Sequence, residues 1–205
     1  MTKISDWKAE INKYKFSIMM SLVFLGAAVV LNYIAGNYVD KAGSVSAPDL
    51  ILDHLPVVDL TVIYLFAYAA MFLFLLCYPL FYDVKRFHIV IGHFSLLVLI
   101  RSFFITLTHL KPPVDAIVVT YPYLNNILVF QNDLFFSGHT AIPFLGYLIY
   151  REEPIGKVFL WVTVLLAATV LLMHVHYSID VFAAIFISYG SYVFGNWFFK
   201  KINYW

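Results

Sequence analysis

Two short polar motifs interrupt the apolar sequence, and their residue types are those that phosphoryl transfer requires. The first motif is Ser137-Gly-His-Thr140, and the second is His176-Tyr-Ser-Ile-Asp180. Both stand beside long apolar runs, where ionisable residues are costly and are usually kept for function. Two imidazoles and a carboxylate in this setting indicate phosphate chemistry at a membrane surface.

His176 and Asp180 are four residues apart, which on a helix places them on one face with β-carbons about 6 Å apart. A carboxylate at this distance accepts the proton of one imidazole nitrogen and leaves the other nitrogen free to attack phosphorus. Tyr177, between them, is a further candidate for contacting substrate. The alternative is an aspartate at a helix end with a neighbouring histidine at the membrane interface.

Ser137, Gly138 and His139 stand where a loop is expected to become a helix. The first helical amides are free, Gly138 allows close approach of an anion, and Ser137 can cap the helix or donate to a phosphate oxygen. His139 would then protonate the leaving oxygen. The alternative is an ordinary serine cap beside an unrelated histidine. Together the two motifs supply a nucleophile, its orienting carboxylate and a general acid, a set that needs no metal ion and no cofactor.

Four further charged residues are candidates for substrate binding. The guanidinium of Arg101, in the third apolar run, suits phosphate oxygens, and a structural ion pair with an acidic loop residue is the alternative. Asp49 and Asp53 share one loop and would contact a cationic head group, Arg101 or the loop itself, unless they are merely solvated. Asp133 precedes the first motif and is alternatively a charge at the N-terminus of its helix.

The composition places this chain in a membrane. Of its 205 residues, 62% are hydrophobic and only 12% are charged, whereas soluble domains have about 25% charged residues. The formal net charge of +1 offers no basic surface for nucleic acid. Cys77 is the single cysteine, so an intrachain disulfide is impossible. We expect an all-α, polytopic membrane protein.

Six apolar segments are candidates for membrane-spanning helices, which need about 20 residues each. They cover residues 16–35, 57–79, 88–108, 135–150, 156–175 and 177–198. The fourth is short and polar at its start, so we expect it to begin at the Ser-Gly pair near one interface or to gain length from residues 124–130. The sequence thus predicts one six-helix membrane domain over residues 16–199, between an N-terminal segment 1–15 and a C-terminal tail 200–205.

Basic residues predict the orientation, because loops rich in Lys and Arg remain in the cytoplasm. With six spans, both termini and the loops 80–87 and 151–157 share one side and hold ten basic residues, against two in the opposite loops. Both termini should therefore be cytoplasmic. The loops 36–56 and 109–134 and the turn at His176 then face the outside, which gathers both motifs at the extracytoplasmic surface.

The two motifs resemble the catalytic motifs of the sphingomyelin synthase family, a branch of the type-2 phosphatidic acid phosphatase-like superfamily. The stretch Phe136-Ser-Gly-His-Thr is similar to the first, and the stretch from His176 to Asp180 is similar to the second. Weaker matches are the Pro-Asp-Leu-Ile-Leu-Asp-His segment at 48–54, the stretch 101–113 and the aspartate four residues before the serine. The resemblance spans roughly residues 48–190 of this chain.

This resemblance implies a six-helix fold and metal-free transfer through a phospho-histidine, with His176 as the nucleophile, Asp180 as its partner and His139 as the acid–base group. The ordinary phosphatase branch has an Arg six residues before its nucleophilic histidine, where this chain has Val170. It also has a Lys…Arg-Pro stretch that is missing here. These differences favour the synthase-like branch.

The leading hypothesis is an integral membrane enzyme that transfers the head-group phosphate of a phospholipid to a lipid alcohol, ceramide or diacylglycerol, or to water. One alternative is a lipid phosphate phosphatase that acts on phosphatidate or a polyprenyl pyrophosphate, although the missing Lys and Arg count against it. The other is a non-catalytic transporter or scaffold, although a pore would need inward polar residues along several helices. The head group, the acceptor and the oligomeric state stay open.

Overall fold

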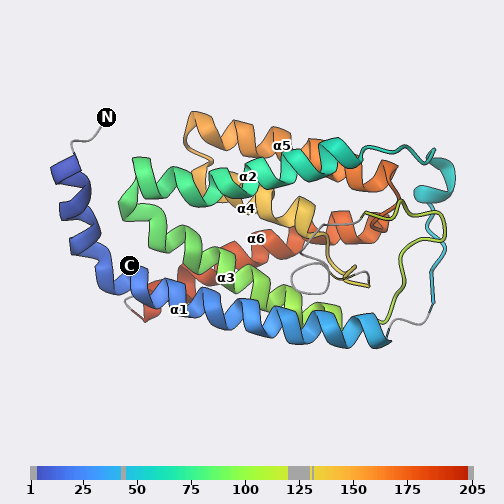
Figure 1. The fold of residues 1–205 in the computed structure, drawn as a ribbon, viewed down its shortest axis with the longest axis horizontal. Coiled ribbons are helices and arrows are strands. Elements are labelled where there is room, and N and C mark those ends of the chain that lie inside the picture. Colours follow the sequence, from blue (N-terminus) through green and yellow to red (C-terminus); the bar gives the residue numbers. More distant parts are fainter. Residues whose placement is uncertain (1–3, 43–44, 120–129, 131, 203–205) are drawn as a thin grey trace.

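The computed structural model describes residues 4–42, 45–119, 130 and 132–202, and its helices lie side by side along one long axis (Figure 1). The helices are α1 (Ile4–Ala42), η1 (Leu52–His54), α2 (Thr61–Tyr82), α3 (Val84–Leu107), α4 (Gly138–Tyr150), α5 (Pro154–Leu172) and α6 (Ser178–Lys201), of which η1 is a short 3-10 helix. The described residues form no β-strand, only an isolated bridge between Val45 and Leu110. The predicted all-α fold is confirmed.

Five of these helices, α1, α2, α3, α5 and α6, are long and apolar enough to cross a membrane, which fits an integral multi-pass protein. The fourth predicted span differs, because α4 has only 13 residues. That is about 20 Å of helix, against a hydrocarbon core of about 30 Å. As expected, α4 begins at the Ser-Gly pair. Residues 124–129 and the chain ends 1–3 and 203–205 lie outside the described residues.

The short helix α4 is the centre of the bundle, where it contacts α2, α3, α5 and α6. Most of its side chains are buried, and Leu145 belongs to the main core together with Leu75 of α2 and Phe159 of α5. At Gly146 the two helices approach closely, since a β-carbon there would lie 2.5 Å from the Phe159 ring. Because protein surrounds α4, its polar start does not have to meet lipid.

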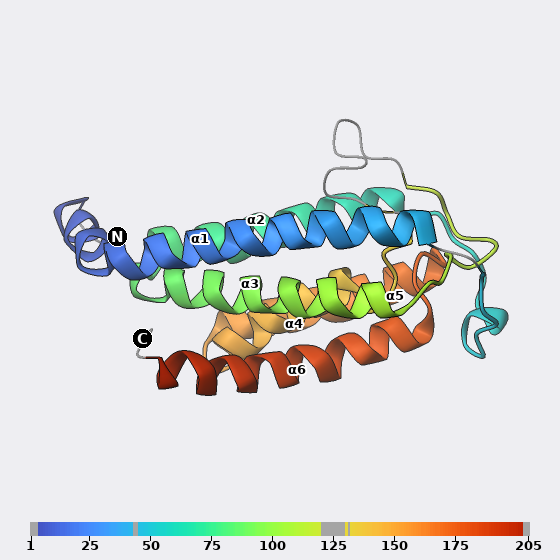
Figure 2. The same ribbon diagram turned by 90° about the horizontal axis from the view of Figure 1, so that it is seen from below.

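The long helix α1 packs chiefly on α3. Figure 2 shows it lying along α3, with its first turns beyond the ends of the other helices. In these turns the indole of Trp7 donates to the carbonyl of Leu80 (2.8 Å). That carbonyl is in the last turn of α2 and has no acceptor role within its own helix. The segment predicted to precede the first span is therefore mostly helical and anchored to the bundle.

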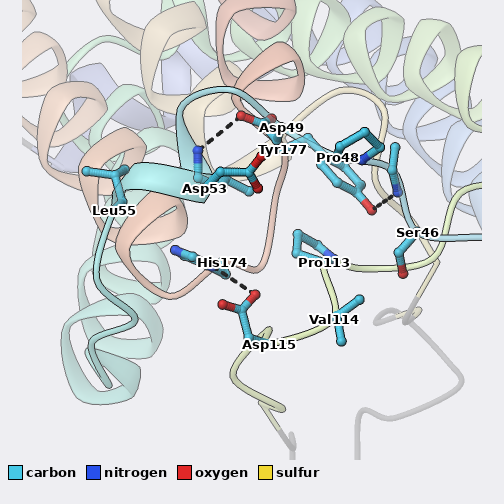
Figure 3. A pocket seen from close by; sticks show the side chains of 12 residues that line it. Ser46, Pro48, Asp49, Asp53, Leu55, Pro113, Val114, Asp115, His174 and Tyr177 are labelled. Carbon is cyan, nitrogen blue, oxygen red and sulfur yellow. Dashed lines mark hydrogen bonds and ion pairs between the residues drawn. The ribbon is translucent and has the colours of Figure 1, made fainter.

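One end of the bundle, on the right of Figure 1, gathers the loops that carry the polar motifs. The opposite end holds the turns from α2 to α3 and from α4 to α5. Four basic residues lie in these turns or in the first turn of the helix that follows: Lys85, Arg86, Arg151 and Lys157. At the first end, the hydroxyl of Tyr177 joins three loops (Figure 3). It donates to the carbonyl of Lys111 (2.8 Å) and accepts from the amide of Ala47 (2.9 Å).

Candidate active site

The imidazole of His176 and the carboxylate of Asp180 lie against each other. His176 is in the turn between α5 and α6, Asp180 is in the first turn of α6, and Nδ1 of the histidine is 3.3 Å from Oδ2 of the aspartate. Both side chains are buried, and Asp180 is completely so. A carboxylate at Nδ1 holds the proton on that nitrogen, so Nε2 keeps its lone pair and is available for attack on phosphorus.

The same carboxylate oxygen also stabilises the start of α6. Oδ2 of Asp180 accepts the amide N–H of Tyr177 (3.0 Å), the residue that caps the helix. An acidic residue at the third helical position is the reciprocal half of a capping box and is favourable at the positive end of a helix. Formation of the helix therefore places the carboxylate against His176.

The first motif meets the second through the backbone. Ser137 is the N-cap residue of α4, and its amide donates to the carbonyl of Asp180 (3.1 Å). Its hydroxyl makes no capping bond and instead accepts from the hydroxyl of Thr140 (3.4 Å). The first amides of α4, which no serine cap occupies, remain for an anion.

His139 lies near His176, with 6.3 Å between the ring centroids. It also lies against two tyrosines of α2, at centroid separations of 4.2 Å to Tyr64 and 4.0 Å to Tyr68. Its Nε2 atom is buried and has no hydrogen-bond partner within the described part of the chain. The two imidazoles are close enough to contact one phosphate group, and this nitrogen is available for proton transfer.

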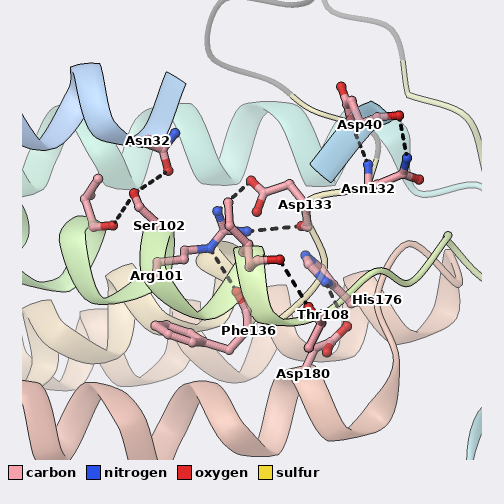
Figure 4. A network of polar contacts seen from close by, with 12 residues as sticks. Asn32, Asp40, Arg101, Ser102, Thr108, Asn132, Asp133, Phe136, His176 and Asp180 are labelled. Carbon is pink, nitrogen blue, oxygen red and sulfur yellow. Dashed lines mark hydrogen bonds and ion pairs between the residues drawn. The ribbon is translucent and has the colours of Figure 1, made fainter. Parts of the chain in front are cut away.

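Arg101 of α3 is held by the loop that precedes α4 (Figure 4). Its Nη1 lies 2.5 Å from Oδ2 of Asp133, Nη2 donates to the carbonyl of Asp133 (3.2 Å), and Nε donates to the carbonyl of Phe136 (2.9 Å). The two side chains are only 14% and 12% exposed. Arg101 therefore forms the structural ion pair with an acidic loop residue that the sequence offered as an alternative. Asp133 lies in the loop before α4 and is not in the first turn of that helix. The guanidinium also lies against Gly138, whose β-carbon would be 3.5 Å from Nε.

The carboxylate of Asp49 accepts hydrogen bonds from its own loop and from the start of α6. Its Oδ2 accepts the amide of Ser178 (2.7 Å), and its Oδ1 accepts the amides of Ile51 (2.9 Å) and Leu52 (3.1 Å). Burial by itself would raise the pKa of Asp49, but these hydrogen bonds outweigh burial and lower the pKa below its ordinary value. An ionised Asp49 thus ties its loop to the start of α6.

Asp53 and Tyr177 line an outer cavity of about 510 Å³ (Figure 3). Neither His139 nor His176 is among its described lining residues. The carboxylate of Asp53 is exposed, and the Tyr177 hydroxyl is used by the loops. The structure therefore separates the predicted site residues by position into an inner group and an outer group. The inner group is Arg101, Asp133, Ser137, Gly138, His139, His176 and Asp180, and the outer group, at the loops, is Asp49, Asp53 and Tyr177.

Sequence reasoning missed Tyr64 and Tyr68. Their spacing of four residues places them on one helix face, but the chain has 15 tyrosines and 20 phenylalanines, so that this signal alone singles out nothing. It also missed the partner of His174, whose Nδ1 is 2.9 Å from Oδ1 of Asp115. These two residues are 59 positions apart, and no local spacing relates them.

The inner group brings together two imidazoles, a carboxylate that orients one of them, and a cation. This set suits attack on phosphorus with protonation of the leaving oxygen. Within the described ranges, no three His, Cys, Asp or Glu side chains are grouped so as to hold a metal ion.

Comparison with known proteins supports the same chemistry. Residues 132–197, which contain both motifs, match the family model described as PAP2 superfamily C-terminal. The match supports the type-2 phosphatidic acid phosphatase superfamily, whose members are generally phosphatases or phosphotransferases. No curated protein and no solved structure matches the chain.

Proposed function

We propose that this protein is a lipid phosphotransferase of the sphingomyelin synthase type, which moves the head-group phosphate of a phospholipid through a phospho-histidine on His176. The observation that carries the proposal is the buried His176–Asp180 pair with His139 at 6.3 Å, inside a bundle of apolar helices. The superfamily match supports phosphate transfer or hydrolysis as the class of reaction.

In the proposed topology, the chain crosses the membrane six times, both termini are cytoplasmic and the site opens to the extracytoplasmic surface. The path of the chain supports this count, because α3 ends and α5 begins at opposite ends of the bundle (Figure 1). The chain must cross between them, and α4 covers the part of that crossing from the first motif to the end of the bundle opposite the loops. The bias of basic residues toward the other end supports the orientation.

In the first step, Nε2 of His176 attacks the phosphorus of a phosphodiester. The bond from phosphorus to the glycerol oxygen breaks, and His139 donates its proton to that oxygen, so that diacylglycerol leaves. Phosphorus keeps the head group and is now bonded to Nε2. Asp180 holds the proton on Nδ1 and stabilises the ring as it gains positive charge.

In the second step, the hydroxyl of ceramide or diacylglycerol attacks the same phosphorus. Its proton passes to His139, the bond from phosphorus to Nε2 breaks, and His176 is regenerated. With water in place of the lipid alcohol, the product is the free phosphorylated head group, and the reaction is that of a phospholipase C. No step requires a metal ion or a cofactor.

The charges of the site favour a phosphodiester. Arg101 supplies one positive charge that Asp133 partly neutralises, and the first amides of α4 add a partial positive charge. A diester carries a single negative charge, whereas a phosphomonoester, with a second pKa of about 6, is close to a dianion at neutral pH. A dianion would need another cation, and Lys41 and Lys111, the described lysines at this end, are exposed.

A lipid phosphate phosphatase is the second candidate, because the match is to the superfamily as a whole. Its substrate would be phosphatidate or a polyprenyl pyrophosphate, water would be the acceptor in the second step, and inorganic phosphate would be released. The charge argument counts against it.

A lipid panel tests the proposal. Purified protein in micelles with EDTA receives choline diesters, ethanolamine diesters or phosphatidate, each with and without ceramide, and products are identified by mass spectrometry. We expect diacylglycerol together with a head-group phosphate on ceramide or in solution. Turnover should fall to background in His176→Ala and persist in His109→Ala, a matched change at an exposed histidine of the same end.

Two results would overturn this assignment. Release of inorganic phosphate from phosphatidate, with no reaction of the diesters, selects the phosphatase. Undiminished turnover by His176→Ala removes the proposed nucleophile and with it the mechanism.

A further inference from the structure

Two aromatic rings from α2 lie against His139, although α2 carries neither motif. The Tyr64 ring is stacked on the imidazole, with 4.2 Å between centroids and 26° between planes. The Tyr68 ring is at 4.0 Å and 37°. These residues are one helical turn apart, so the α2 backbone delivers both rings to one imidazole.

Core packing sets the positions of these rings. Tyr64 is only 7% exposed and belongs to a cluster with Val170, Met173 and Val181, from the ends of α5 and α6 that flank His176. Tyr68 packs on the main core, beside Phe72. The imidazole of His139 is thus held by rings that are themselves immobilised by the surrounding helices.

The rings also favour the positively charged form of His139. An aromatic face is electron-rich and attracts a cation that lies on it. The charged groups that act on His139 are Arg101 from α3 and His176 from the turn before α6. Arg101 and a charged His176 oppose positive charge on His139, while Asp133 and Asp180 are engaged with Arg101 and His176. The tyrosine rings therefore supply a favourable contact for the imidazolium that the others do not.

We infer that Tyr64 and Tyr68 are positioning residues for His139: their rings orient the imidazole and stabilise its protonated, proton-donating form. The inference rests on the acid–base role proposed for His139. It deepens that role, because it assigns to α2 the task of keeping the acid charged in a buried site.

The test is the pH–rate profile of ring-preserving and ring-deleting variants at both positions. Activity that requires a protonated acid declines as the pH rises, which gives the profile its basic limb. In Tyr64→Leu and Tyr68→Leu we expect lower kcat and a basic limb moved about one unit to lower pH. In Tyr64→Phe and Tyr68→Phe the limb should keep its position. Phe66→Leu, at a 73% exposed position of the same helix, is the matched control and should leave the profile unchanged.

A second series keeps the shape of the ring and so protects the fold. Phenylalanines with progressively more fluorine, incorporated at position 68, withdraw electron density from the ring face without deleting it. The basic limb should move to lower pH step by step with fluorination. A purely structural role predicts no such movement.

The outcomes separate this inference from the proposed function. A fixed basic limb in the Leu variants and across the fluorinated series overturns the inference, and so does a Phe variant that moves the limb as far as Leu does, since the hydroxyl would then be responsible. If His176→Ala remains active, the proposed function fails as well. Loss of activity in His176→Ala with a fixed limb removes only the role of the tyrosines.

Discussion

Oδ2 of Asp180 serves both the folding of α6 and the chemistry proposed for His176. It accepts the amide of Tyr177, which caps the helix, and it faces Nδ1 of His176. A hydrogen-bond acceptor is enough for the first role. The second role needs a negative charge as well, because the imidazole gains positive charge when its Nε2 attacks phosphorus. The two roles are therefore separable by an isosteric substitution.

Asp180→Asn should lower activity far more than stability. Its amide oxygen can still accept from Tyr177, so we expect the thermal unfolding midpoint to fall by only roughly 2 °C. The same oxygen would still face Nδ1 of His176, but it carries no negative charge and would not stabilise the positive charge that the imidazole gains as Nε2 attacks. We expect turnover of the phosphodiester to fall about 10²-fold or more. Equal damage to folding and to turnover, measured on the same purified sample, would contradict the separation.

The stability of the outer loops should depend on pH through Asp49. Hydrogen bonds from the backbone lower its pKa below the ordinary 3.8, so the ionised carboxylate contributes stability above that pH and loses it as the pH falls through the folded value. Asp49→Asn should unfold roughly 3 °C lower than the wild type at pH 7. The difference should close below about pH 4. A difference that is constant with pH in thermal melts would rule out an ionised Asp49 as its cause.

At the residue scale, the sequence predicted contacts that helix geometry dictates, and it left open those that loop paths decide. The pairing of His176 with Asp180 follows from a spacing of four residues. The partner of Arg101 does not follow from spacing, because the path of the loops decides which acidic residue reaches it. Asp133 is that partner, 32 residues away.

At the element scale, α4 brings the first motif into the interior of the bundle. The helix is short because it starts inside the bundle and does not reach the loop-bearing end. Four other helices contact it. Its position depends on close contact with α5, where Gly146 leaves room for the ring of Phe159. Phe159 is 1% exposed, so its ring is enclosed by neighbouring side chains and a shift of the ring would disturb their packing.

Gly146→Ala should therefore destabilise the protein. A β-carbon at 2.5 Å from the Phe159 ring overpacks the crossing of α4 and α5, at a cost of about 1–3 kcal/mol. Gly190→Ala in α6 is the matched control, because nothing lies within 4 Å of its β-carbon. There the better helix propensity of alanine should raise the unfolding midpoint slightly. Thermal melts in detergent that show the same sign for both variants would contradict this account of the crossing.

Hydropathy predicted which segments form long apolar helices better than where those helices begin and end. The expected first span starts at residue 16, yet α1 starts at Ile4. Lys8, Glu10 and Lys13 lower the hydropathy of the first turns but are good helix formers. The reverse holds for α4, where apolar residues before Gly138 extended the expected span, although the chain there is not helical.

At the scale of the whole molecule, the two ends of the bundle differ in charge. The end with the motifs carries the carboxylates of Asp49, Asp53 and Asp115 in its loops, and most Lys and Arg residues lie at the opposite end. The positive-inside rule therefore predicts an orientation with the motifs outside. The prediction that the two ends lie on opposite sides of the membrane depends on a crossing that includes α4.

Cysteine labelling tests this topology. In a Cys77→Ser background, Val114→Cys lies in the loop at the motif end and Glu152→Cys in the turn between α4 and α5, at positions 94% and 88% exposed. An impermeant maleimide added to intact cells should label Val114→Cys, and it should label Glu152→Cys only after permeabilisation. Labelling of both in intact cells would mean that the chain does not cross the membrane between them.

The most direct test of the whole account is the covalent state of His176 during turnover. The wild-type protein is mixed with a phosphodiester lipid without lipid acceptor, quenched in alkali to preserve phosphoramidates, digested and analysed by mass spectrometry. The account predicts the mass of the head-group phosphate on His176, and its disappearance when acceptor is added before the quench. An unmodified His176 while diacylglycerol accumulates, or an adduct on another residue, would contradict it.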